Sequence, residues 1–203
     1  MLFNQQKGLF LALCLLLGGC QTATDYVNYQ DLLSHSKGPF FQNEQEALGF
    51  ENVQTLEPQT LQVAELRVTG PVMKSQGFLS TFSLYETSVL DRATYGIEVT
   101  SRCFSCIGLH KNIAVPRLIL FDQDGVEIPT MAEGNGVFSS LNFTQYFNVM
   151  TPQSVKIIVT SDNRFDGGSH LVFPANQSNS IRIPASFHYG AEGNITLQLK
   201  KVE

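Results

Sequence analysis

Two cysteines three positions apart, Cys103 and Cys106, have the spacing in this chain that points most directly to chemistry. Three interpretations are open. A zinc site would need two further ligands, and His110 is the nearby candidate. A thioredoxin-like redox pair should lie where a strand runs into a helix, whereas strand-like residues precede this pair and loop-like residues follow it. We favour a structural disulfide, which requires Phe104 and Ser105 to turn, because a bridge holds its two Cα atoms within about 7 Å.

A pair of carboxylates, Asp122 and Asp124, could begin a calcium-binding loop. The EF-hand pattern fails, because Val126 occupies its fifth position and Glu127 stands where the loop needs glycine. The letters Asp-Gln-Asp-Gly are instead typical of a hairpin turn after a strand. We therefore predict a turn and no metal site, with a looser calcium site as the alternative.

Aromatic and amide side chains gather in two places where a sugar could bind. A glycan site needs aromatic faces for the C–H surface of the sugar and amide or carboxylate groups for its hydroxyls. The predicted ligand-binding residues are Asn142, Gln145, Tyr146 and Asn148 in the first cluster, and Asp162, Asn163 and Phe165 in a second one on a loop. The competing interpretation is core packing, which we favour for the neighbouring Phe138 and Phe143. The chain has no Trp, which weakens any strong stacking platform.

Catalytic motifs do not occur in this sequence. It lacks the Gly-x-Ser-x-Gly, His-Glu-x-x-His and Gly-x-x-x-x-Gly-Lys patterns, and its four histidines are scattered. We therefore predict that the protein is not an enzyme and uses no cofactor. A thiol-redox or hydrolytic enzyme is the hypothesis to weigh against this one, and it would need a reactive cysteine pair or a pocket joining His110 or His188 to a nucleophile.

The composition excludes one class of partner. The chain carries 13 Lys and Arg against 18 Asp and Glu, which gives a net charge of −5, and only 15% of its residues are charged. Such a chain cannot supply the cationic surface that binds a phosphate backbone, so we expect no nucleic-acid partner. Its 43% of apolar residues is typical of a globular protein.

The N-terminus has the features of a targeting segment. An unbroken apolar run covers residues 9–17 behind Lys7. A helix of that length covers roughly 14 Å, about half of a bilayer core of ~30 Å, so we predict a signal peptide rather than a membrane span. No later segment is long and apolar enough to cross a membrane.

The end of this run, Leu17-Gly18-Gly19-Cys20, resembles the bacterial lipobox, in which an aliphatic and two small residues precede the cysteine that receives lipid. The resemblance implies cleavage after residue 19, acylation of Cys20 with palmitate-type chains, and anchoring in a membrane. Gln21 implies sorting to the outer membrane, facing the periplasm. The alternative is an ordinary secretory signal. Domain boundaries follow as 1–19 for the signal peptide, 20–44 for a lipidated tether and linker, and 45–203 for the folded domain.

Two short helices are predicted before the main domain. One lies within the tether, near residues 26–33. The other covers residues 43–48, where Asn43 is a suitable N-cap and Glu46 follows three residues later.

From about residue 59 the apolar residues recur with period two. Alternation is clear at Tyr95, Ile97 and Val99 and again over 195–199, while 118–121 is continuously apolar and predicts a strand buried on both sides. We also expect a first strand around Leu61, Val63, Leu66 and Val68, with a slip near Ala64. Strands of this length with frequent turn signals predict an all-β fold, a single antiparallel β-sandwich or jelly-roll-like domain.

Several of these segments resemble, in order, those of the maltose operon periplasmic protein (MalM) family. They are Gly70-Pro71-Val72, the stretch from Val115-Pro116 to Asp124-Gly125, Thr151-Pro152 with the strand that follows, and Ile183-Pro184 with the closing strand. The likeness covers about residues 45–199. It departs from the family at the Cys103–Cys106 segment, in the lipobox, and in lacking a helical C-terminal extension.

The resemblance implies a non-enzymatic periplasmic accessory in carbohydrate uptake. The resulting hypothesis is an outer-membrane lipoprotein of the MalM-like type that binds maltodextrin or a transport protein. The alternative is a structural or adaptor lipoprotein of the cell envelope that binds a protein partner through its sandwich edge or loops.

Overall fold

The computed structural model describes residues 28–102, 110–134, 141–165, 169–172 and 185–202. The helical segments are α2 (Tyr29–Ser34), α3 (Glu44–Ala47) and the 3-10 turn η1 (Asn163–Phe165). The strands are β1 (Phe40–Phe41), β2 (Val53–Leu56), β3 (Leu61–Leu66), β4 (Val72–Ser75), β5 (Phe78–Thr87), β6 (Ala93–Arg102), β7 (His110–Ile113), β8 (Pro116–Phe121), β9 (Met131–Gly134), β10 (Leu141–Val149), β11 (Lys156–Ser161), β12 (Ser169–Val172), β13 (Ala185–Tyr189) and β14 (Gly193–Lys201). Cys20, Cys103 and Cys106 lie outside the described residues.

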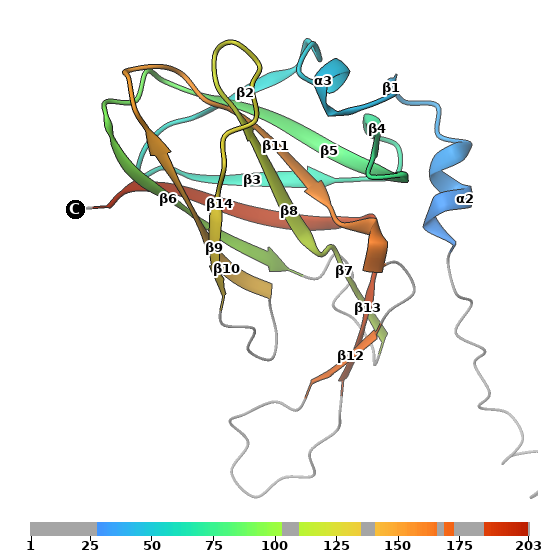
Figure 1. The fold of residues 1–203 in the computed structure, drawn as a ribbon. Helices are drawn as coiled ribbons and strands as arrows, with labels where there is room; N and C mark the ends of the chain where they lie inside the picture. Colours follow the sequence, from blue (N-terminus) through green and yellow to red (C-terminus); the bar gives the residue numbers. More distant parts are fainter. Residues whose placement is uncertain (1–27, 103–109, 135–140, 166–168, 173–184, 203) are drawn as a thin grey trace, which may run out of the picture.

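The strands form two large sheets and one small sheet (Figure 1). The first sheet has the order β1-β4-β5-β11-β8, and β2 also pairs with β5. The second has the order β3-β14-β6-β10-β9, and all of its neighbouring strands are antiparallel. The small sheet has the order β12-β13-β7. The chain therefore folds as the all-β sandwich that the alternating pattern predicts.

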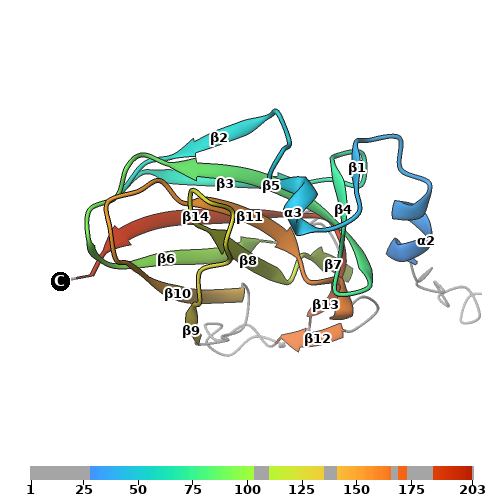
Figure 2. The same cartoon turned by 45° about the horizontal axis from the view of Figure 1, so that its top comes forward.

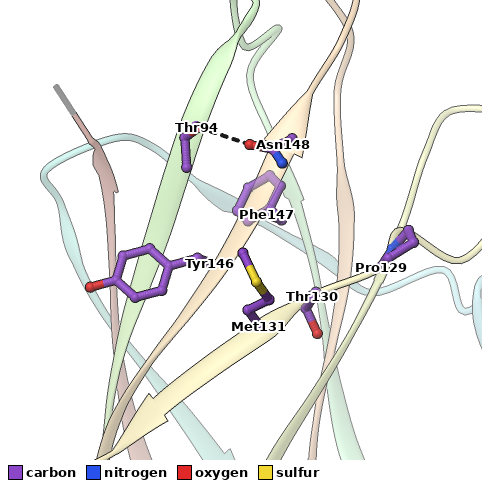
Figure 3. A pocket seen from close by; sticks show the side chains of 7 residues that line it. All are labelled: Thr94, Pro129, Thr130, Met131, Tyr146, Phe147 and Asn148. Atoms are coloured by element: carbon purple, nitrogen blue, oxygen red, sulfur yellow. Dashed lines mark hydrogen bonds between the residues drawn. The ribbon is translucent and has the colours of Figure 1, made fainter.

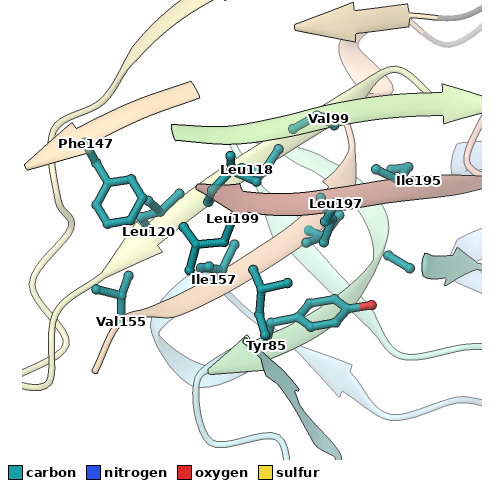
Figure 4. Packing of buried hydrophobic residues seen from close by; sticks show 14 of the residues in the cluster. Tyr85, Val99, Leu118, Leu120, Phe147, Val155, Ile157, Ile195, Leu197 and Leu199 are labelled. Atoms are coloured by element: carbon teal, nitrogen blue, oxygen red, sulfur yellow. The ribbon is translucent and has the colours of Figure 1, made fainter. Parts of the chain in front are cut away.

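The main core lies between the two large sheets (Figure 4). Alternate residues of β6 and β14, including Ile97, Val99, Leu197 and Leu199, point into it, as the sequence pattern predicts. Leu120 and Ile157 meet them from the opposite sheet and have no exposed surface. This arrangement turns the other residues of β6 and β14 away from the core.

Strand β8 is buried on both faces, which confirms the interpretation of its continuous apolar run. Leu118 and Leu120 belong to the main core, whereas Ile119 and Phe121 belong to a second cluster on the other side of the sheet. Helix α3 and its neighbours Phe41 and Phe50 cover that second side. The predicted cap of α3 is confirmed, because the Asn43 side chain accepts a hydrogen bond from the Glu46 amide at 2.8 Å.

Helix α2 packs against the sandwich, so the packed body begins before residue 45. Tyr29 and Leu33 are 5% and 1% exposed and contact Val72 and Ala191. Figure 2 shows α2 at one end of the sandwich beside β1 and β4. The predicted tether is therefore part of the folded body from Asn28 onward.

Strand β3 differs from its sequence pattern. Leu61 and Val63 are 62% and 46% exposed, whereas Ala64 and Leu66 are buried. The register explains this: Leu61 and Val63 lie opposite Gln198 and Thr196, on the face of the sheet that points away from the core, whereas Ala64 lies opposite the buried Ile195.

The hairpin predicted at Asp122 is confirmed. Its Oδ1 atom accepts hydrogen bonds from the amides of Asp124 and Val126 at 3.0 and 2.8 Å, and Gly125 takes a positive φ of 76°. Among the described residues, no helix is long and apolar enough to cross a membrane.

Candidate functional site

The surface of the second sheet that faces away from the core is polar over β6, β10 and β14, whereas the edge strand β3 adds the exposed Leu61 and Val63. We call this surface the outer face. The residues on it include Asn142, Thr144, Tyr146 and Asn148 from β10, Thr94, Gly96, Glu98 and Thr100 from β6, and Thr196, Gln198 and Lys200 from β14. Its central charges are paired, because Lys200 donates to Glu98 across 2.6 Å. The outer face therefore offers hydroxyl and amide groups with little net charge.

Tyr146 lies against the sheet above a glycine. Gly96 is its cross-strand partner on β6, and a Cβ atom built there would come within 3.1 Å of the ring carbon Cε1. A side chain at position 96 would therefore require the ring to move by a few tenths of an ångström. Glycine in a strand interior often marks such a close approach.

A hollow of about 200 Å³ opens beside this ring (Figure 3). Its lining residues are Thr94, Pro129, Thr130, Met131, Tyr146, Phe147 and Asn148. No Asp, Glu, His, Lys or Cys occurs among these seven described residues, so the hollow can offer hydrogen bonds and apolar contact but no general acid–base pair.

Asn148 provides the hollow with a polar group that has no described partner for one of its atoms. The Thr94 hydroxyl donates to Asn148 Oδ1 at 2.8 Å, which orients the amide group of Asn148. The Nδ2 atom of Asn148 donates to no described residue. The Tyr146 hydroxyl also forms no hydrogen bond with a described residue. An aromatic ring with an adjacent oriented amide is an arrangement that suits a sugar ring.

Gln145 points to the opposite side of β10. It is only 6% exposed and donates through Nε2 to the Leu118 carbonyl at 3.3 Å and to Thr130 Oγ1 at 2.8 Å. Its alternation with Tyr146 places it inside the sandwich, where it secures the segment that forms one wall of the hollow.

Asn142 lies on the outer face but outside the hollow. It is exposed and pairs with Thr100, six residues along β10 from Asn148. At about 3.4 Å per residue, the two asparagines are roughly 20 Å apart. Of the first predicted cluster, the structure therefore brings Tyr146 and Asn148 together and separates them from Asn142 and Gln145.

The second predicted cluster serves the fold at another place. Asp162 accepts hydrogen bonds from Arg164 Nε at 2.8 Å and Nη2 at 2.5 Å. Burial acts to raise the pKa of Asp162, but the hydrogen bonds and charge of Arg164 outweigh it and lower the pKa. Asn163 is 3% exposed and donates through Nδ2 to the Leu79 carbonyl at 2.6 Å, and its buried Oδ1 atom has no partner among the described residues. Phe165 ends η1, and its side chain lies outside the described residues.

Thr94, Pro129, Thr130 and Met131 also line this site, although no motif in the sequence marks them. They reach the hollow through the register of three strands, in which Met131 lies opposite Tyr146 and Asn148 lies opposite Thr94. The one local signal was Gly96, which interrupts an alternating strand.

Comparisons with known proteins include a remote structural likeness. No protein-family model matches the chain, and no curated protein matches its sequence. The 1.0 Å crystal structure of the pre-peptidase C-terminal domain of a collagenase from Bacillus anthracis superposes with a TM-score of 0.35 at 11% identity, covering 74% of this chain and 97% of that domain. A TM-score this low indicates neither a shared fold nor a shared function.

Proposed function

We propose that this protein is an outer-membrane-anchored periplasmic lipoprotein of the MalM-like type, a non-enzymatic accessory in carbohydrate transport that binds a neutral maltodextrin. The observation that supports this is the Tyr146 ring seated over Gly96 beside Asn148, whose Nδ2 atom donates to no described residue. The ring provides an apolar surface for the sugar, and the amide provides donors to its hydroxyls. The paired charges of the outer face favour an uncharged glycan over an anionic one.

Calorimetric titration of the mature protein with maltodextrin tests this proposal. We expect saturable binding that Tyr146→Ala weakens at least about tenfold, which corresponds to about 1.4 kcal/mol. Tyr146→Phe keeps the ring and should lose less affinity. Asn148→Ala should weaken binding, whereas Asn142→Ala, a matched change on the same strand and face, should not. Absence of saturable binding by folded protein would refute the carbohydrate role.

A second function, that of an adaptor for an envelope protein, is favoured by one feature. Strand β3 pairs with β14 on one side and with no described strand on the other, and it exposes Leu61 and Val63. Such an edge can pair with a strand of another protein. If the protein is an adaptor, crosslinking from position 63 in intact cells should capture a protein partner, and a Val63→Lys variant should no longer bind that partner. Maltodextrin should then not bind to the protein.

A further inference from the structure

Helix α2, the first described helix after Cys20, is held firmly against the sandwich. Gln30 accepts a hydrogen bond from the Leu79 amide at 2.8 Å and donates one to the Leu79 carbonyl at 2.9 Å, as a neighbouring strand would. Leu33 is buried, and Tyr29 packs so closely on Gly190 that a Cβ atom there would come within 2.4 Å of its ring. Any force on the chain before residue 28 therefore acts on this end of the body.

Only a short stretch of chain separates α2 from Cys20. Eight residues along the chain lead from Cys20 to Asn28, and even a fully extended chain of that length reaches no more than about 29 Å. If Cys20 carries the lipid, as the proposed function holds, the α2 end of the body cannot move farther than this from the membrane surface.

This end of the sandwich exposes apolar side chains next to lysines. Leu32 is 42% exposed, Phe40 is 48% exposed and Phe78 is 38% exposed. They belong to α2, β1 and the start of β5, which are neighbours because α2 contacts β5, β1 pairs with β4, and β4 pairs with β5. Lys37 and Lys74 are exposed on the same elements and their connections. We call these five residues the anchor end.

Phenylalanine and leucine beside lysine suit the boundary between lipid headgroups and acyl chains. Aromatic side chains favour this boundary, and lysines are attracted to anionic lipid phosphates. Asp31 is also exposed here, beside His35, with 3.9 Å between its Oδ1 atom and the ring Nδ1 atom. Phe40 and Lys74 lie on the face of the β4–β5 hairpin that α2 covers, and Phe78 lies on the other face at the end of the hairpin. The exposed side chains therefore surround the end of the body to which the short chain from Cys20 leads.

We propose that the anchor end lies against the phospholipid headgroups and that the hollow faces away from the membrane. This rests on the lipidation of Cys20 in the proposed function. Strand β14 begins at Gly193, two residues after the α2 contact Ala191, and reaches Lys200, the neighbour of Gly96. That is about 23 Å along the strand. The lipid surface and the glycan would therefore meet opposite ends of one rigid body (Figure 1).

The absence of Trp from the sequence gives a direct test. Each of Phe40→Trp and Phe78→Trp would be introduced into the full lipidated protein, together with Val89→Trp as the matched control. Val89 is 70% exposed and lies just beyond the far end of β5 from Phe78. The proteins would be reconstituted in vesicles of phosphatidylethanolamine and phosphatidylglycerol that carry brominated acyl chains, which quench tryptophan on contact.

We expect at least threefold stronger quenching at positions 40 and 78 than at position 89. A Gly190→Ala change in the same proteins, which displaces Tyr29 and frees α2, should reduce this difference. Equal quenching at all three positions, or the strongest quenching at position 89, would overturn the inference.

Mass spectrometry of the same samples separates this inference from the proposed function. If Cys20 is acylated and quenching shows no preference, the inference alone is refuted, and the anchored-lipoprotein proposal stands. If Cys20 is unmodified, the inference and the anchor both fail. Maltodextrin binding, measured without vesicles, stays an independent test of the hollow.

Discussion

The contact between Tyr29 and Gly190 gives a prediction whose size follows from the structure. Gly190 does not have a positive φ angle, so alanine can adopt its backbone conformation without strain. The added Cβ atom, however, would lie 2.4 Å from Tyr29 Cε2 and 2.8 Å from Cζ, where ordinary contacts begin near 3.4 Å. The ring must therefore move by about 1 Å or leave its site.

The expected loss of stability in Gly190→Ala equals the free energy that burial of the Tyr29 ring contributes. A large side chain that is 5% exposed contributes about 2–3 kcal/mol by burial. Because Tyr29 starts α2, the Gln30 contacts with Leu79 should open with it. The Leu79 amide would then exchange its hydrogen faster by about 30- to 100-fold, since about 1.4 kcal/mol corresponds to tenfold.

Hydrogen exchange followed by mass spectrometry or NMR measures this effect, and a double-mutant cycle assigns it. In a Tyr29→Ala background no ring is left to displace, so Gly190→Ala should then cost less than about 0.5 kcal/mol. Unchanged protection of the Leu79 amide in Gly190→Ala, or an equal cost in both backgrounds, would refute the reasoning.

Two other changes test the hollow and the buried carboxylate. Gly96→Ala should weaken maltodextrin binding several-fold in calorimetry while changing the unfolding free energy by less than about 1 kcal/mol, because its Cβ atom meets the movable Tyr146 ring and the glycine backbone has no positive φ. Asp162 has a pKa lower in the folded protein than in the unfolded chain, so its stabilising contribution is complete above the ordinary value of about 3.9 and is lost as the pH falls through the folded pKa. Urea unfolding should therefore show a loss of stability below about pH 4 that is smaller in Asp162→Asn, and an identical acid profile in both proteins would contradict the role of Arg164.

Local patterns predicted the elements whose environment is set by their own alternation. The buried series Tyr95, Ile97 and Val99 places β6 correctly, because the rule that successive side chains face opposite sides holds within any strand. The cap at Asn43 was equally predictable, because it involves residues three positions apart. These features need no knowledge of the rest of the fold.

The features that sequence reasoning missed depend on partners far along the chain. Gln145 looks like a surface ligand by type, yet it is buried because the Leu118 carbonyl and Thr130 satisfy its amide. Leu61 looks like a core residue by type, yet it is exposed because its register with Gln198 places it on the outward face of the sheet. Strand order and register determine the burial of both residues, and the local sequence pattern predicts neither the order nor the register.

The distance between the α2 contact and the hollow has a consequence for how the protein would work. Gly190 and Gly96 each pack against a tyrosine ring, and the two contacts lie near opposite ends of β14, about 23 Å apart along the strand. Changes this far apart without shared partners are expected to be additive. Gly190→Ala should therefore free the anchor end without altering maltodextrin affinity, and Gly96→Ala should weaken binding without changing orientation on the membrane. A sandwich with this independence can hold a glycan at a fixed height above the lipid surface. Coupling between the two changes would instead mean that the sheet transmits a rearrangement from one end to the other.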